Sequence, residues 1–303
     1  MIILPSLQQL RFFVAVADQC HFGRAAASCG VTQSTLSTGI QELEARLGVA
    51  LIERSRRGVV LTALGEAVLE RARRLLADAE DLAALAQSAR EPLTQPLRLG
   101  VIPTIGPYLV PAIMRDLGKT FPKLQLYLRE EQTAPLLPQL AEGKLDLVLL
   151  ALPYATEDFE TLALGSDPIE AVLPKDHPLA KRKTIPAAAL AEEKLLLMED
   201  GHCLRSHALE ACRLSGAGRN ENLQGTSLRT VVQMAAGGLG VTLVPRLALA
   251  QELPADGNLV ARPLDKDAPP RVIALAWRRG AARREEFRRF GAYVKNVLAR
   301  SAA

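Results

Sequence analysis

The sequence predicts an N-terminal all-α winged helix-turn-helix domain with a long linker helix, followed by a two-lobed α/β domain. Three observations lead to this fold class. Short helical patterns end at glycines within the first 62 residues. One helical run without a breaker follows, up to Pro92 and Pro96. Strand and helix patterns then alternate over about 200 residues, more than one small sheet needs. The expected domains are residues 1–62, the linker and hinge at 63–92, and residues 93–303.

Composition is that of an ordinary globular protein. The chain has 49% hydrophobic and 23% charged residues, and its net charge of +4 is compatible with nucleic-acid binding without requiring it. Its start lacks the pattern of a signal peptide, and its apolar runs are shorter than the ~20 residues of a membrane helix. We therefore expect a cytoplasmic protein without membrane contact. In that compartment its four cysteines are expected to be catalytic, metal-binding or redox-sensing rather than structural.

The first 62 residues follow the order helix, helix, glycine turn, helix and wing. Ser6 caps the first helix, Gly30 ends the second, and Thr32 opens the third, which runs to Leu47. Strand patterns at 51–54 and 59–62 then flank a turn with a basic tip, which is typical of a wing.

Such a domain reads bases with the first residues of its recognition helix and holds phosphates with basic side chains. The candidates on the helix are short polar residues: Thr32, Gln33, Ser34, Thr35, Ser37 and Thr38. The candidates on the wing, for phosphate or minor-groove contacts, are Arg54, Arg56 and Arg57. Taken alone, each is more typical of a helix cap or a solvated turn, so the prediction depends on the whole arrangement.

Residues 63–89 predict one helix of about 25 residues, almost 40 Å long. Its apolar positions include Leu64, Val68, Leu75 and Leu82. Because it is too long for the small domain before it, we interpret it as a connector that packs against a second copy of itself. The alternative is a core helix of the following domain.

Beyond the hinge, the pattern predicts βα units with parallel sheets. Strands are expected at 97–102, 125–130, 145–150, 171–173, 194–198, 241–244 and 271–277, and helices at 107–121, 133–142, 226–236 and 283–300. Thr104 and Thr133 follow strands at helix starts. Such positions attract polar oxygens, although a threonine there is equally an ordinary cap.

The segment from Glu199 to Cys212 concentrates reactive side chains. His202 and Arg205 flank Cys203 and can favour its thiolate. Cys212 follows nine positions later, which in one helix would separate the Cα atoms by roughly 13 Å. A disulfide needs them within about 7 Å. The two cysteines are therefore either unrelated or joined only when their segment refolds.

Residues 8 to 66 resemble the DNA-binding domain of LysR-type transcriptional regulators. The matching runs are Gln9–Phe13, Phe22–Ala26, Val31–Ser37, Ile40, Leu43–Glu44, Leu47–Gly48, Leu51–Arg54 and Leu61–Gly65. The resemblance extends over the linker and a two-lobed, periplasmic-binding-protein-like regulatory domain. It implies a homodimer or homotetramer on double-stranded promoter DNA, with RNA polymerase as a further partner.

The segment at Cys203 is similar to the redox centre of OxyR-type peroxide sensors, one branch of that family. Further matches are Ile102–Thr104, Phe121–Leu124, Glu131–Thr133, Gly143–Asp146 and Thr226–Leu228. The resemblance implies that Cys203 is the peroxidatic and Cys212 the resolving cysteine. It also implies a peroxide pocket shaped by the residues Thr104, Thr133, His202 and Arg271, and we add Arg205 as a neighbour of the thiol.

The function we predict is a transcription regulator that senses hydrogen peroxide through a reversible Cys203–Cys212 disulfide and controls oxidative-stress genes. We expect no cofactor and no metal, since the set His202, Cys203, His207 and Cys212 contains no CxxC-type ligand pair. One alternative is a regulator of the same family that binds a small organic acid between its lobes. The other is an enzyme, a thiol peroxidase, for which the N-terminal 62 residues would have no use.

Overall fold

The computed structural model describes residues 4–55, 58–88, 93–211, 219–253, 257–266 and 268–301. The chain divides into two compact units. One consists of Met1–Gln87 with Ala141–Lys144, and the other of Ser88–Leu140 with Leu145–Ala303. We call the second the regulatory unit and consider each unit by itself.

The N-terminal unit is a winged helix-turn-helix, as predicted. It contains α1 (Leu7–Gln19), α2 (Phe22–Cys29), α3 (Gln33–Leu47), β1 (Ile52–Ser55), β2 (Gly58–Leu61) and α4 (Ala63–Ser88). The Ser6 hydroxyl caps α1, and the Thr32 hydroxyl accepts from the Thr35 amide to cap α3. Gly30 ends α2 with φ of 70°, a left-handed conformation that favours glycine.

The wing is fastened to the recognition helix by one carboxylate. Glu44 on α3 accepts hydrogen bonds from the backbone N–H groups of Leu51 (2.8 Å) and Ile52 (3.1 Å). The strands β1 and β2 pair antiparallel from Ile52–Leu61 to Ser55–Gly58. The predicted tip residues Arg56 and Arg57 lie outside the described residues.

Helix α4 has 26 residues, close to the length predicted for the linker. Leu69 and Ala72 are buried in the same apolar cluster as Phe13 and Leu36, so one stripe of α4 belongs to the core of the N-terminal unit. Another set of apolar side chains is exposed, including Leu75 and Leu82, the latter 70% exposed. Helix α4 is therefore not a core helix of the following domain, and an exposed apolar stripe remains on it.

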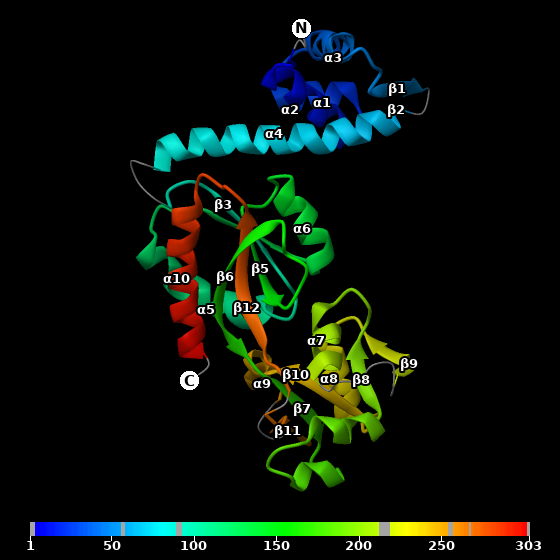
Figure 1. Cartoon of the computed structure of the whole chain (residues 1–303), viewed down its shortest axis with the longest axis vertical. Coiled ribbons are helices and arrows are strands. Elements are labelled where there is room, and N and C mark those ends of the chain that lie inside the picture. The colour runs from blue at the N-terminus through cyan, green and yellow to red at the C-terminus, as the bar shows by residue number, and fades with distance from the viewer. Residues whose placement is uncertain are drawn as a thin grey trace. The chain divides into compact units, whose positions relative to one another are not determined.

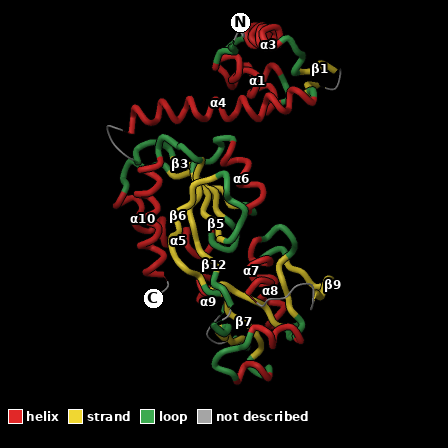
Figure 2. The backbone as a smooth tube through the Cα atoms, viewed as in Figure 1, coloured by secondary structure: helices red, strands yellow, loops and turns green. Residues whose placement is uncertain are grey.

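The regulatory unit contains two five-stranded sheets, each with its own helices (Figures 1 and 2). The first lobe has strand order β4-β3-β5-β12-β6, and the second has β11-β7-β10-β8-β9. Their bounds are β3 (Leu97–Val101), β4 (Leu126–Glu130), β5 (Leu147–Leu152), β6 (Phe159–Asp167), β7 (Ile169–Pro174), β8 (Leu195–Met198), β9 (Arg219–Gly225), β10 (Val241–Pro245), β11 (Leu259–Pro263) and β12 (Arg271–Arg278).

Parallel sheets were expected, and that prediction was wrong in part, because both sheets are mixed. Strand β12 runs antiparallel to β5 and β6, and β7 runs antiparallel to β10 and β11. The physical reason is that the chain passes between the lobes twice. It leaves the first sheet at Pro168 between β6 and β7, and it returns between β11 and β12. A strand that returns in this way enters the sheet against the direction of its neighbours.

Helices flank both sheets (Figure 2), and their buried apolar residues belong to the cores of the two lobes. The first lobe carries α5 (Gly106–Thr120), α6 (Thr133–Ala141) and α10 (Arg284–Ser301). The second carries α7 (Cys203–Ala211), α8 (Leu228–Ala236), α9 (Arg246–Glu252) and the 3₁₀ turns η1 (Pro178–Lys181) and η2 (Ala187–Glu192). Separate apolar clusters form the cores of the two lobes.

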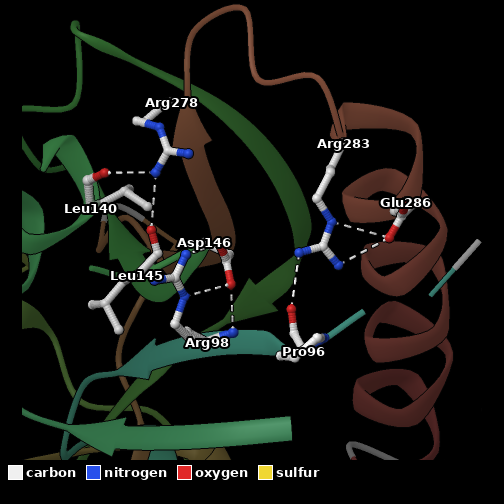
Figure 3. A network of polar contacts seen from close by, with 8 residues as sticks. All are labelled: Pro96, Arg98, Leu140, Leu145, Asp146, Arg278, Arg283 and Glu286. Atoms are coloured by element: carbon white, nitrogen blue, oxygen red, sulfur yellow. Dashed lines mark hydrogen bonds and ion pairs between the residues drawn. The ribbon is translucent and has the colours of Figure 1, made fainter. Parts of the chain in front are cut away.

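A network of arginines ties the start of the regulatory unit to its C-terminal part (Figure 3). The buried Arg283 guanidinium pairs with Glu286 at 3.0 Å and donates to the Pro96 carbonyl at 2.9 Å. Glu286 also accepts from the Leu93 N–H. Leu93 and Pro96, which follow the hinge, are therefore held by Arg283 and Glu286 at the beginning of α10.

Candidate functional site

Cys203 is the first residue of α7, directly after the loop that leaves β8. It is a free thiol, and it is buried with 7% of its surface exposed. Its chain neighbours belong to the second lobe, yet its side chain packs in the apolar cluster of the first lobe, with residues such as Ile102 and Ile105. The thiol therefore lies where the two lobes of the regulatory unit meet.

Burial raises the pKa of the Cys203 thiol above its ordinary value. Three influences oppose that rise, in this order: the charge of Arg271, the Thr133 hydroxyl, and the backbone N–H groups of Leu204 and Cys203 at the start of α7. We expected His202 and Arg205 to favour the thiolate. The group that does so most is instead Arg271, which comes from strand β12.

Arg271 is fixed on both sides by buried partners. Its guanidinium pairs with Asp167 at 2.8 and 3.0 Å, and it donates to the hydroxyl (2.8 Å) and carbonyl (2.9 Å) oxygens of Thr104. Asp167 also accepts from the Leu247 N–H on α9. The planar fork of donors thus joins β6, β12 and the loop after β3. The sequence-predicted residues Thr104 and Arg271 are in direct contact.

Thr133 opens α6 and is buried. Its hydroxyl has no hydrogen bond of ordinary geometry among the described residues, although it lies near enough to Cys203 to lower the thiol pKa. A buried hydroxyl without a full partner is costly, typically about 1–3 kcal/mol. It is available to a small polar molecule or to a thiolate at this position.

His202 faces Gln132 across the loop between β8 and α7. The Nε2 atom of its ring lies 3.0 Å from the Gln132 amide nitrogen, and Glu199 is 3.9 Å away. Burial lowers the pKa of His202, and Glu199 offsets this in part, so the ring is neutral at pH 7. Gly201 allows this approach, because its φ is +96° and an added Cβ would lie 2.6 Å from the Gln132 side-chain oxygen.

Arg205 points elsewhere. Its guanidinium donates to the Met198 carbonyl at 3.1 Å and pairs with Asp200 at 2.9 Å. These contacts hold the loop before α7, and none of them involves the Cys203 thiol.

Three residues at this site were not predicted. Asp167 orients Arg271, Gln132 orients His202, and Tyr154 interacts electrostatically with Cys203. Only Gln132 had a signal in the sequence, as a neighbour of Thr133. Strand pairing brings Asp167 to the site, and a turn of the chain after β5 brings Tyr154 there. No local sequence pattern predicts either of these.

Metal binding finds no support in the part of the chain that the structure describes. No group of three or more His, Cys, Asp or Glu side chains there has the arrangement of a metal site. Cys212, the proposed partner of Cys203, lies outside the described residues, as α7 ends at Ala211. Among the described residues, no helix is long and apolar enough to cross a membrane.

The predicted DNA-contacting residues gather on the first turns of α3. Thr32, Gln33, Ser34, Thr35 and Thr38 are exposed there, and Ser37 is half-buried. The Thr32 hydroxyl lies 2.9 Å from the Ser34 hydroxyl and 2.8 Å from that of Thr35, which orders the turn. Arg54 lies on β1, opposite Val59.

Family comparisons agree with this architecture. Residues 7–66 match the model described as bacterial regulatory helix-turn-helix protein, lysR family, and residues 90–299 match the LysR substrate binding domain. The chain belongs to the LysR family. This LysR-family chain is 43% identical over 290 residues to the DNA-binding transcriptional dual regulator OxyR of Escherichia coli, with 96% of this chain and 95% of the relative covered.

Solved structures of similar proteins extend the likeness to the whole chain. A full-length OxyR variant from Pseudomonas aeruginosa matches with a TM-score of 0.80 and 36% identity, covering 96% of this chain and 98% of that one. A cysteine-to-serine variant of Corynebacterium glutamicum OxyR with H2O2 bound matches with a TM-score of 0.68 and 35% identity, covering 100% and 95%. Both comparisons place this LysR-family chain beside OxyR proteins.

Proposed function

We propose that this LysR-family chain is a DNA-binding transcription regulator that senses hydrogen peroxide by forming a reversible Cys203–Cys212 disulfide. The observation that carries the proposal is the buried Cys203 thiol, on which Arg271 and the Thr133 hydroxyl act, with Arg271 itself bonded to the Thr104 hydroxyl. Peroxide-related names and a peroxide-bound structure among its similar proteins support the choice of oxidant.

The first step oxidises the thiol. The Cys203 sulfur attacks one peroxide oxygen, the O–O bond breaks, and the second oxygen leaves with the thiol proton as water. The product is a sulfenic acid. The charge of Arg271 stabilises the thiolate form of Cys203 that attacks, and the Thr104 and Thr133 hydroxyls can bond the peroxide oxygens.

The second step closes the disulfide. The Cys212 thiol displaces the sulfenic hydroxyl, which leaves as water. In α7 the Cα atoms of Cys203 and Ala211 are separated by about 12 Å along the axis. A disulfide needs its Cα atoms within about 7 Å. Closing the bond therefore requires α7 to unwind, which turns oxidation into a conformational change.

The remaining assignments follow from this function. Residues 1–62 would bind promoter DNA, with Thr32, Gln33, Ser34, Thr35, Ser37 and Thr38 at bases and phosphates. Arg54, Arg56 and Arg57 would contact phosphates or the minor groove. Residues 63–92 would couple two copies of the chain, through apolar side chains such as Leu75 and Leu82. Residues 93–303 would sense the oxidant. A homodimer or homotetramer that contacts RNA polymerase in the cytoplasm is part of the proposal.

The test is thiol counting on the reduced full-length protein with one equivalent of hydrogen peroxide. We expect the count to fall from four thiols to two, with Cys203 and Cys212 linked in the peptide map. Cys203→Ser should keep its remaining thiols and should not respond to peroxide in a promoter assay. The matched controls Cys20→Ser and Cys29→Ser should behave as the wild type.

Other outcomes favour other functions. No loss of thiols, together with a promoter response by Cys203→Ser, would refute peroxide sensing and leave a small organic acid as the effector. Steady peroxide turnover with a reductant by a fragment that lacks residues 1–62 would instead indicate a thiol peroxidase.

A further inference from the structure

The imidazole of His207 is buried on α7 with one nitrogen bonded and the other without a partner. Its Nε2 lies 2.8 Å from the Pro153 carbonyl oxygen, and the side chain is only 4% exposed. A carbonyl only accepts, so Nε2 carries the proton. The Nδ1 atom is buried and has no hydrogen-bond partner among the described residues. The ring is therefore a neutral donor whose one hydrogen bond joins α7 to the residue that follows β5.

His207 and Cys203 occupy one face of the helix. They are four positions apart on α7, a spacing that places Cβ atoms about 5–6 Å from each other. The same short segment after β5 meets both of them. Pro153 bonds His207, and the next residue, Tyr154, interacts electrostatically with Cys203. The His207–Pro153 hydrogen bond therefore lies one helical turn after Cys203 along α7.

Pro153 follows the central strand β5 of the first lobe, whereas α7 covers the sheet of the second. The His207–Pro153 bond therefore fastens the helix of one lobe to the main chain of the other. Within α7, the side chain that bonds the first lobe's backbone is the one that stands directly behind Cys203.

We propose that His207 is a positioning residue: its bond to Pro153 holds α7 wound and docked, keeps Cys203 beside Arg271, and must break when α7 unwinds. The inference rests on the proposed Cys203–Cys212 disulfide. It adds that His207 sets how strongly the reduced form is favoured over the disulfide form. Loss of the bond should release α7 and shift the balance toward the disulfide.

A histidine at position 207 also makes the equilibrium between the reduced form and the disulfide form depend on pH. Burial lowers the pKa of His207, and the hydrogen bond to the Pro153 carbonyl offsets this in part. The groups around the ring are Arg271, which lowers the pKa further, Glu210, which raises it, and the uncharged Cys203 and Tyr154. Unwinding exposes the ring, whose pKa then returns to about 6.5. Protonation therefore favours the unwound form. The docked helix has its full stability above about pH 6.5 and loses stability as the pH falls below it.

The test measures the reduction potential of the full-length protein in mixtures of oxidised and reduced dithiothreitol, where two protein thiols give two electrons and two protons to the reagent. His207→Leu removes the donor, and His207→Gln keeps one, because the Gln amide nitrogen reaches about as far as Nε2. Leu and Gln are both good helix formers, so helix propensity does not separate them. His177→Gln is the control at a histidine that bonds Leu179 and Glu193.

At pH 7.5 we expect His207→Leu to favour the disulfide about tenfold, which is about 30 mV more negative for a two-electron couple. His207→Gln should lie within about threefold of the wild type, as should the control. At pH 5.5 the wild type should become more negative than His207→Gln, since only the wild type takes up a proton at position 207.

Equal potentials for wild type and His207→Leu at pH 7.5, or no divergence between wild type and His207→Gln at pH 5.5, would overturn the inference. The second comparison decides the matter even where reduced His207→Leu does not fold. A wild type that forms no Cys203–Cys212 disulfide in these buffers would instead refute the proposed function.

Discussion

The buried pair of Arg271 and Asp167 allows the reactivity of Cys203 to be separated from the stability of the regulatory unit. Arg271→Leu would leave the Asp167 carboxylate, 3% exposed, without its cation. Removing one partner of a buried pair costs about 3–5 kcal/mol. The Thr104 carbonyl also loses a donor, which places the loss in the upper part of that range. For a unit of about 200 residues this lowers Tm on the order of 10 °C.

The double variant Asp167→Leu/Arg271→Leu is the informative control. It leaves no lone charge, so most of the lost stability should return, although the Leu247 N–H loses its acceptor. Both variants should react with peroxide more slowly than the wild type, because both lack Arg271, the group that does most to lower the thiol pKa. Urea unfolding and the rate of thiol loss measure the two effects. A double variant as unstable as the single one, or a single variant that reacts at the wild-type rate, would refute this reasoning.

Three further predictions concern the same unit. Gly201→Ala should place a Cβ against the Gln132 side chain and separate Gln132 from His202, which should slow the loss of thiols with peroxide. An unchanged rate would contradict a role of the Gln132–His202 contact in the reaction. Tyr108→Phe removes the hydrogen bond to the buried Glu252 carboxylate and should cost about 1–3 kcal/mol in urea unfolding, with an unchanged midpoint as the contrary result. Because burial raises the Cys203 pKa, the rate of reaction with peroxide should keep rising above the ordinary thiol range near pH 8.5, and a plateau well below that pH would exclude a raised pKa.

Local patterns in the sequence predicted most helices and most strands, but not α9 or the strands β6, β9 and β11. A helix cap such as Ser6 or a helix end such as Gly30 depends on only a few neighbouring residues. The order of the helices and strands in the N-terminal unit was therefore predictable. Strand direction was not, because whether β12 runs with or against β5 depends on the path of the chain through the second lobe. Nothing within a strand of eight residues records that path.

The candidate site divides in the same way. Cys203 and its two threonines could be found from motifs. Its electrostatic surroundings were predicted only in part, since the resemblance implied Arg271, whereas Arg205 was expected near the thiol and sequence neighbours on a helix point in different directions. Arg205, two residues away, bonds the Met198 carbonyl, whereas the cation that acts on the thiol comes from β12.

The position of β12 in the first sheet has a consequence for the order in which the protein is made. This strand, Arg271–Arg278, lies between β5 and β6, whose residues leave the ribosome more than a hundred positions earlier. The sheet of the first lobe therefore lacks this strand until nearly the whole polypeptide has been synthesised, while helices α1 to α4 of the N-terminal unit are made at an early stage. During synthesis, the helices of the helix-turn-helix are therefore made before the first lobe of the regulatory unit is complete. A chain truncated before Arg271 would therefore contain helices α1 to α4 of the N-terminal unit and lack the arginine that acts on the Cys203 thiol.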